Sequence, residues 1–333
     1  MKLPRYDMGV RPSQITPESQ YFSRRQVLAA AASISAMSLR PLSVLAQASV
    51  VTAAAASGSE VFAAEASDAH ALMLKPDKSP YSVNEAVTSI EVATTKTRFR
   101  ELEPDIEKNG HGFVTSPWQL AIEGECLKPR IFGLDELLRI APMQERIYRM
   151  LCNEGFLHVV PYIGYSLSEL LKKVEPTNNA KFLEMTAVMN PTQLPGQREI
   201  TYIPWPYVEG LRIDEAMHPL TLVAMGAYGK LLPKGLGSPI AIRAPWKFGT
   251  KSPKAVVRLR LTEKQPATIW TTRYPQYHSF WGNINPAGVT NVLGWGQQER
   301  KAGDIFKRAT PLFNGYAEHV ASMYAGMNPN EMF

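Results

Sequence analysis

The chain has only two cysteines among its 333 residues, and most short motifs that mark common enzyme sites are absent. There is no C-x-x-C or H-E-x-x-H, and the six histidines are scattered singly, so the sequence offers no zinc or haem site. A G-x-G-x-x-G loop, a G-x-x-x-x-G-K-[ST] loop and a G-x-S-x-G elbow are also missing. These absences remove support for nucleotide-binding, metalloprotease and α/β-hydrolase chemistry.

A dense run of basic residues is lacking too, although the formal net charge is +6. Residues 1–48 hold six Lys or Arg against two Asp or Glu, so four of those positive charges lie there. The rest of the chain carries +2, which is no electrostatic footprint for a nucleic acid. We therefore expect no nucleic-acid partner.

The one pronounced apolar stretch belongs to an export signal rather than to a membrane span. Arg24 and Arg25 precede an Ala-rich segment at 29–45, and the A-Q-A sequence at 46–48 fits the small-residue rule for signal cleavage. Paired arginines mark the twin-arginine export route; an ordinary signal with a chance arginine pair is the alternative. We predict a twin-arginine signal peptide at 1–48, a flexible leader at 49–79, a main domain at 80–333 and a periplasmic location.

The main domain consists of many short periodic segments separated by Gly, Pro and Asn. Alternating apolar and polar residues predict a strand at 255–261, and apolar residues on one helical face predict a helix at 166–174. Similar patterns predict strands at 118–124, 147–151, 181–188 and 240–244, a helix at 133–140 and a buried segment from 159 to 163. Strands and helices do not alternate regularly, so an α+β fold is expected.

Cys152 lies where a predicted strand ends and a polar turn, C-N-E-G, begins. A cysteine in that place can present a thiolate to a metal or a substrate. Free cysteine is also among the most buried residue types, so a small core hydrophobe is the simpler interpretation on residue type alone. Cys126 lies in a predicted turn 26 residues earlier, and the spacing allows a disulfide without indicating one.

Longer sequence segments favour the metal-binding interpretation. The stretch E-R-I-Y-R-M-L-C-N-E at 145–154 resembles the cysteine motif of the sulfite-oxidase-like molybdoenzymes. Within that family it is most similar to the periplasmic members that reduce methionine sulfoxide. The most specific match is P-Y-V-E-G-L-R-I-D-E-A-M-H-P-L-T-L at 206–222, and the resemblance extends over residues 80–326.

The resemblance implies a sulfite-oxidase-like molybdopterin-binding fold and an oxidoreductase with a molybdenum–molybdopterin cofactor. Cys152 would ligate the metal, since soft thiolates suit a soft, redox-active metal, and Glu154 would lie beside it at the catalytic centre. The implied substrate is methionine sulfoxide in oxidised periplasmic proteins, and the implied electron donor is a membrane-bound haem subunit. Residues at or next to the family's pterin contacts are Glu101, Thr186, Arg243, Ser252, Pro253 and Lys254.

Several of these contacts depart from the family pattern. The family threonine aligns with Ala187, and Thr186 is its neighbour, whose side chain would face the other side of a strand. The family asparagine aligns with Leu236 and the family arginine with Ala241. Arg243 lies two residues further on, so on a strand it shares a face with residue 241 and could reach the pterin phosphate.

These departures leave three interpretations open. In the first, the same cofactor is bound through shifted contacts, with Arg98 and Arg100 adding positive charge for the phosphate. In the second, the scaffold has lost molybdopterin and serves as a binding protein or a redox thiol. In the third, the chain is a sulfite-oxidising relative. We favour the first, because Cys152, Glu154 and the export signal are all retained.

Overall fold

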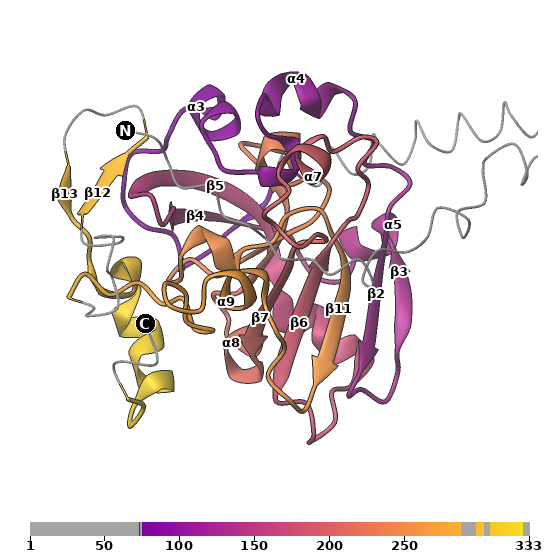
Figure 1. Cartoon of the computed structure of the whole chain (residues 1–333). Coiled ribbons are helices and arrows are strands. Elements are labelled where there is room, and N and C mark those ends of the chain that lie inside the picture. The colour runs from indigo at the N-terminus through magenta and orange to yellow at the C-terminus, as the bar shows by residue number, and fades with distance from the viewer. Residues whose placement is uncertain (1–72, 74, 288–297, 303–306, 329–333) are drawn as a thin grey trace, which may run out of the picture. The chain divides into compact units, whose positions relative to one another are not determined.

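Two mixed β-sheets form the core of the structure, a computed structural model that describes residues 73, 75–287, 298–302 and 307–328 (Figure 1). The predicted export signal lies outside these residues. The larger sheet consists of β1 (Asp77–Lys78), β4 (Gln144–Leu151), β5 (Phe156–Ser166), β8 (Leu222–Ala227), β9 (Lys230–Leu231), β10 (Ala241–Arg243), β12 (Gln298–Lys301) and β13 (Arg308–Ala309). The smaller sheet has the order β3 (Arg130–Gly133), β2 (Gln119–Gly124), β11 (Val256–Thr262), β6 (Phe182–Ala187) and β7 (Val208–Arg212).

The helices of the described residues are all short. The α-helices are α3 (Ile90–Thr95), α4 (Ile106–His111), α5 (Leu134–Leu138), α6 (Leu167–Leu171), α7 (Gly196–Glu199), α8 (Ile213–Met217), α9 (Ile269–Arg273) and α10 (Ala317–Val320). Single 3₁₀ turns are η3 (Arg100–Leu102), η4 (Lys172–Val174), η5 (Lys234–Leu236), η6 (Gly249–Lys251), η7 (Leu312–Gly315) and η8 (Ala321–Tyr324). The expected α+β class is confirmed, and both sheets mix parallel and antiparallel pairs.

The centre of the larger sheet is buried on both faces. β5 pairs with β4 on one side and with β8 on the other, both antiparallel. Its residues from Leu157 to Tyr165 are all buried, as are all six residues of β8. Strands covered on both faces are continuously apolar rather than alternating, which explains why the sequence indicates a buried segment there.

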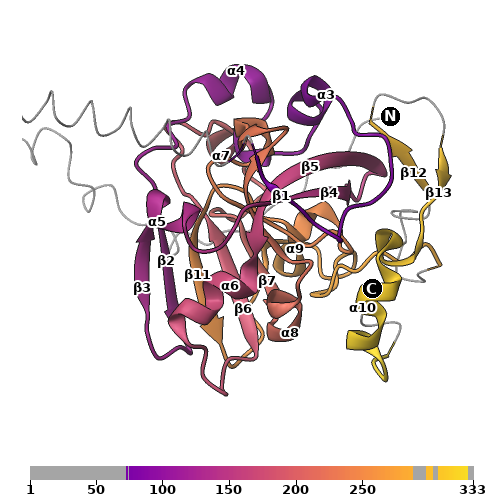
Figure 2. The same cartoon turned by 180° about the vertical axis from the view of Figure 1, so that it is seen from behind.

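The carboxyl-terminal half of β11 has the alternating pattern that the sequence predicts. Leu259 and Leu261 are buried and Arg260 between them is exposed, whereas a register irregularity between Val256 and Arg258 interrupts the alternation earlier in the strand. β11 pairs with β2 in parallel and with β6 in antiparallel register. Leu259 and Leu261 pack in one apolar core with residues of β2 and β6, and Figure 2 shows helix α6 lying over this sheet on the reverse side.

Each predicted strand and helix of the main domain is present, with bounds that differ by a few residues. The amino-terminal boundary is different, because β1 lies inside the segment expected as a leader. β1 pairs in parallel with β4, and Met73 is fully buried. Met73 and β1, which lie before residue 80, therefore pack with the main domain.

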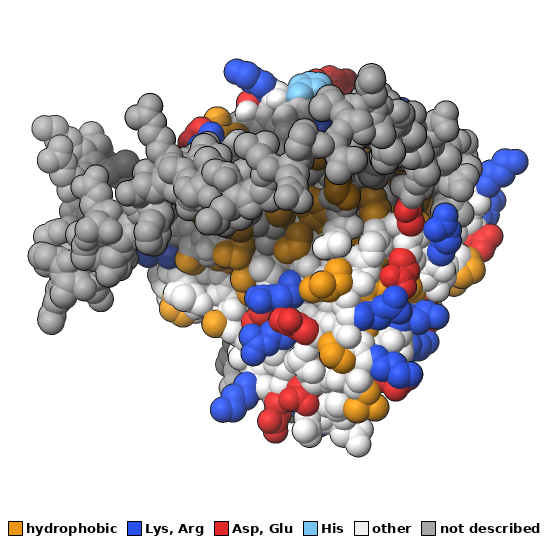
Figure 3. Space-filling view, turned by 90° about the vertical axis from the view of Figure 1, so that its right-hand side faces the viewer, with side chains coloured by type: hydrophobic (Ala, Val, Ile, Leu, Met, Phe, Trp, Pro, Cys, Tyr) orange, Lys and Arg blue, Asp and Glu red, His pale blue; other side chains and the backbone are white. Residues whose placement is uncertain are grey.

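Cys126 and Cys152 are both free thiols, so the possible disulfide is not formed. No helix within the described ranges combines the length and the apolar character needed to cross a bilayer. On the face shown in Figure 3, basic and acidic side chains are intermingled rather than gathered by sign.

Candidate active site

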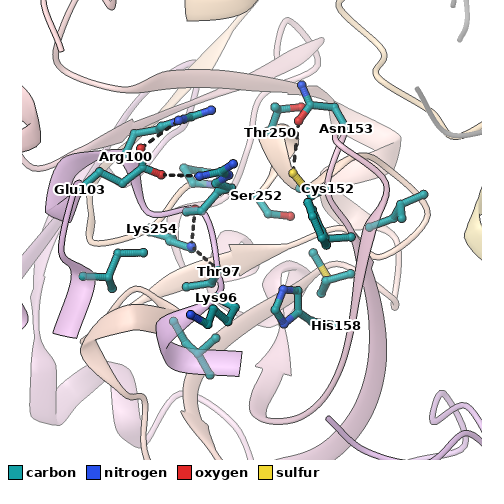
Figure 4. A pocket seen from close by; sticks show the side chains of 18 of the residues that line it. Lys96, Thr97, Arg100, Glu103, Cys152, Asn153, His158, Thr250, Ser252 and Lys254 are labelled. Carbon is teal, nitrogen blue, oxygen red and sulfur yellow. Dashed lines mark hydrogen bonds and ion pairs between the residues drawn. The ribbon is translucent and has the colours of Figure 1, made fainter. Parts of the chain in front are cut away.

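A cavity of about 530 Å³ opens where three segments meet. The first is the turn between β4 and β5, the second is residues 97–103, and the third is residues 249–254 ahead of β11. Figure 4 shows Cys152, Asn153 and Thr250 on one side of this cavity and Arg100 and Glu103 across from them. Segments remote in sequence therefore form a single concave site.

Cys152 begins a tight turn that leads from β4 into β5. Its backbone N–H donates to the carbonyl of Phe156 at 2.9 Å, and the N–H of Gly155 donates to the carbonyl of Cys152 at 2.9 Å. Gly155 has φ of +83°, a conformation that favours glycine. The polar turn predicted from the sequence is confirmed, and it places the Cys152 side chain in the cavity wall.

The Cys152 sulfur has two polar neighbours. The thiol donates to Asn153 Oδ1 at 3.3 Å, and the backbone N–H of Glu154 donates to Sγ at 3.5 Å. Burial raises the pKa of the thiol, and the Glu154 N–H opposes that effect. The charges of Arg98 and Arg100 also lower this pKa, but burial outweighs them and the net shift is upward. A bound metal would hold the sulfur as the thiolate.

Arg243 lies at the end of β10 and is 2% exposed. Its Nη1 donates to the carbonyl of Ser252 at 3.2 Å and its Nη2 donates to the carbonyl of Leu236. Its Nε is buried and has no hydrogen-bond partner in the part of the chain described. Burial lowers the pKa of this guanidinium, because a desolvated charge without an anion is unfavourable.

Lys254 and Glu101 form the second charged part of the wall. Lys254 Nζ donates to Thr97 Oγ1 at 3.2 Å and to the carbonyl of Arg98 at 2.6 Å. Burial lowers the pKa of Lys254, and Arg243 lowers it further. Burial raises the pKa of Glu101, against the attraction of Lys254. Burial thus disfavours the charged form of both side chains.

Five of the six expected pterin contacts line the cavity together with Cys152: Glu101, Arg243, Ser252, Pro253 and Lys254. Thr186 does not. The antiparallel register of β6 and β11 places it opposite Arg258, whose Nη2 donates to Thr186 Oγ1 at 3.3 Å. Thr186 is therefore part of the smaller sheet rather than of the cavity wall, and the adjacent Ala187 packs in a separate apolar cluster.

Glu154 lies just outside the wall and accepts hydrogen bonds from two arginines of the opposite segment. Arg98 contacts its Oε2, and Arg100 Nη2 lies 3.3 Å from its Oε1. Arg100 also pairs with Glu103 at 2.8 Å. The extra charge expected from Arg98 and Arg100 is therefore largely balanced by Glu103 and Glu154.

His158 and Tyr162 also line the cavity, although no sequence motif marks either of them. Both belong to β5 and are four residues apart, so their side chains lie on the same face of the strand. Burial lowers the pKa of His158 to about 4, and Lys254 adds to that effect. The Tyr162 ring lies 5.0 Å from the Arg243 guanidinium carbon. The even spacing of His158 and Tyr162 could have indicated a shared strand face. Because β5 is buried on both faces, its sequence does not alternate and that spacing does not stand out.

Residues 109–270 match a protein-family model described as the oxidoreductase molybdopterin binding domain. The chain is 39% identical over 330 residues to the protein-methionine-sulfoxide reductase catalytic subunit MsrP of Burkholderia mallei, covering 96% of this chain and 95% of that protein. It is also 39% identical over 333 residues to the MsrP of Pseudomonas syringae pv. tomato, covering 96% of each.

Among solved structures, the sulfane dehydrogenase SoxCD of Paracoccus pantotrophus is similar in part. The two chains are 20% identical with a TM-score of 0.39, and the match covers 46% of this chain and 40% of that one. The agreement with the MsrP sequences is far more extensive.

Proposed function

The chain belongs to the family of protein-methionine-sulfoxide reductase catalytic subunits, and from this premise we propose that it reduces methionine sulfoxide in oxidised periplasmic proteins with a molybdenum–molybdopterin cofactor. The observation that carries the proposal is the Cys152 side chain in the wall of a cavity that Arg243 and Lys254 also line, within a chain 39% identical to the MsrP of Burkholderia mallei along nearly its whole length. Membership in this molybdopterin-binding oxidoreductase family disfavours the cofactor-free interpretation.

The residues of the cavity fit such a cofactor. Arg243 Nε is a buried donor without a partner among the described residues, and Lys254 lies in the same wall. A phosphate beside them would supply the missing anion. His158 Nδ1 is a second buried atom of the wall that has no partner in the described ranges, and a ring edge of the pterin could satisfy it.

Cys152 would be the protein ligand of the metal. Across the described ranges, no group of three or more His, Cys, Asp or Glu side chains is arranged to hold a metal ion. A single thiolate therefore suits a metal whose other ligands come with its cofactor. When bound, the molybdenum centre supplies two-electron oxygen-atom transfer; the overall balance is sulfoxide plus two electrons and two protons giving thioether and water.

The surrounding residues would orient the cofactor and supply protons. Ser252 and Leu236 fix the Arg243 fork through their carbonyls, so the guanidinium is pre-organised for an anion. The Glu101 carboxyl holds its proton to a higher pH than an exposed glutamate does, so it can retain one in the cavity. Met150, Leu151 and Phe156 add apolar surface to the same wall, which limits water there.

The remaining assignments follow from the same proposal. Residues 1–48 would be removed as a twin-arginine signal after the cofactor is loaded, and the main domain would act in the periplasm. The relatives are named as catalytic subunits, so a partner subunit is expected; we propose a membrane-bound haem protein that donates electrons. No haem motif occurs in this chain, consistent with a separate electron donor.

Metal analysis tests the proposal directly. The protein is purified from a host that makes molybdopterin and from a matched host that does not, and molybdenum per chain is measured. Reduction of an oxidised protein by an artificial electron donor is assayed beside oxidation of sulfite. We expect close to one molybdenum per chain and reductase activity only from the first host. Protein without molybdenum from the competent host contradicts the proposal, and faster sulfite oxidation favours the sulfite-oxidising interpretation.

A further inference from the structure

The turn that carries Cys152 is tied to residues 97–103, called the strap below, by an ion-pair cluster. We propose that Arg98 and Arg100 of the strap are positioning residues for the Cys152 sulfur and act on it through Glu154. The inference deepens the proposed function and rests on it for the metal-binding role of Cys152. On this inference the strap and the turn form one side of the cavity wall as a connected unit.

The connection from the arginines to the sulfur is short. Arg98 and Arg100 contact different oxygens of the Glu154 carboxylate. The backbone N–H of the same Glu154 donates to Cys152 Sγ at 3.5 Å. Fixing the Glu154 side chain therefore restrains the one backbone donor of the turn that points at the sulfur.

The positive and negative charges of the cluster are equal in number, so no unpaired charge destabilises it. Two arginines face two carboxylates, since Glu103 lies 2.8 Å from Arg100 and 3.7 Å from Arg98. The hydrogen bond to Glu154 raises the pKa of Arg98 despite partial burial. Because 54 and 56 residues separate the partners, these contacts report the tertiary position of the strap rather than local sequence.

The strap is itself anchored, which makes it a firm support. A Cβ at Gly196, at the start of α7, would lie 1.8 Å from the carbonyl oxygen of Arg100, so only glycine allows this close backbone approach. On the other side, Lys254 Nζ donates to the carbonyl of Arg98 at 2.6 Å. The strap backbone therefore packs closely against α7 at Arg100 and is hydrogen-bonded by Lys254 at Arg98, and the two arginine side chains connect this backbone to the turn.

The experiment removes each charge without removing the side chain. Arg98→Gln, Glu154→Gln and the double variant are compared with Arg130→Gln. Arg130 is a matched control because its side chain is 49% exposed, against 48% for Arg98, and it also pairs with a glutamate, Glu136. Arg98→Lys tests rescue by a conservative cation.

Two measurements decide the proposal. The first is amide hydrogen exchange of residues 153–155 in cofactor-free protein, and the second is the Mo(V) electron paramagnetic resonance spectrum of loaded protein. We expect each single variant to speed exchange by about 2- to 5-fold, as for loss of a partly exposed ion pair. We also expect changed g-values in Arg98→Gln and Glu154→Gln, near wild-type behaviour in Arg98→Lys, and no change in Arg130→Gln.

Coupling between the two positions is the sharpest outcome. If Arg98 acts through Glu154, the double variant exchanges no faster than the faster single variant. The inference is overturned if the rate increases of the two single variants multiply in the double variant. It is also overturned if exchange at residues 153–155 is unchanged, or if Arg130→Gln speeds exchange there by the same factor. Exchange is measured without cofactor, so a wild-type protein that lacks molybdenum defeats the proposed function while this measurement still decides the role of the strap.

Discussion

Replacement of Arg243 is the most informative perturbation of the candidate site. The guanidinium is 2% exposed, and its Nε lacks a hydrogen-bond partner within the residues described. If a cofactor phosphate occupies that position, Arg243→Ala removes a charge-assisted hydrogen bond worth about 1.5–3 kcal/mol. That loss corresponds to about 10- to 150-fold weaker retention of the cofactor.

The assay follows cofactor release and not only activity. Loaded Arg243→Ala is diluted into buffer without cofactor, and both the fluorescence of released, oxidised pterin and the molybdenum that stays with the protein are recorded. Arg243→Lys keeps the charge but loses the planar guanidinium fork. Its retention of the cofactor should therefore lie between that of the wild type and that of Arg243→Ala. Arg243→Ala also leaves the carbonyls of Leu236 and Ser252 without their donor. Thermal unfolding of each cofactor-free variant is therefore measured in parallel, to separate a loss of stability from a loss of cofactor binding.

Arg258→Ala is the matched control for loss of an arginine. Arg258 also has a buried Nε without a partner in the described ranges, but it lies on β11 and outside the cavity. Its removal should leave pterin release unchanged. Wild-type pterin content and release in Arg243→Ala would refute the reasoning, since they would show that no anion depends on this guanidinium.

Three further predictions concern the metal ligand, export and pH. Cys152→Ser should nearly abolish sulfoxide reduction and change the Mo(V) resonance signal, because a hard, poorly ionised oxygen replaces a soft sulfur. Cys126 lies outside the cavity wall, so Cys126→Ser should leave that signal unchanged. An unaltered spectrum in Cys152→Ser would contradict metal ligation by Cys152. Replacing Arg24 and Arg25 by Lys should leave an active precursor in the cytoplasm on cell fractionation, and normal export would count against the twin-arginine route. Burial lowers the pKa of His158 from 6.5 to about 4, so the unfolded chain binds a proton more readily and the free energy of unfolding should fall by up to about 3 kcal/mol as pH drops through that window. Urea titrations at several pH values should show a smaller fall in His158→Gln than in wild type. Part of the fall should remain in the variant, because burial also lowers the pKa of His278 to about 4.

The sequence was sufficient to find the fold class, the elements and the metal-ligand candidate. Apolar and polar residues alternate along the end of strand β11 because one face of the strand packs in the core. That alternation is visible within a few consecutive residues of the sequence. Cys152 could be found because the turn after β4 is encoded within a few residues, including a glycine with positive φ. Long motifs identified the family for the same reason, since each is a continuous stretch of chain.

Only the tertiary structure could sort the pterin contacts. Spacing along a strand placed Thr186 on the face opposite the family threonine and Arg243 on the face of the family arginine, but it could not show which face meets the cavity. The pairing of β6 with β11 turns Thr186 to Arg258 and away from the cavity. Arg243 reaches the cavity wall because β10 pairs with β8 at the edge of the other sheet. A period of two predicts which residues share a face but not what that face meets.

The pairing of charges was likewise beyond the sequence. Arg98 and Arg100 suggest free positive charge when the chain is examined alone, and their partner Glu154 lies 54 to 56 residues away. Electrostatic neutralisation depends on distances of a few ångströms between side chains, and folding sets those distances. Local patterns therefore determine which groups this protein carries, whereas sheet pairing and chain crossing determine which of them meet at Cys152.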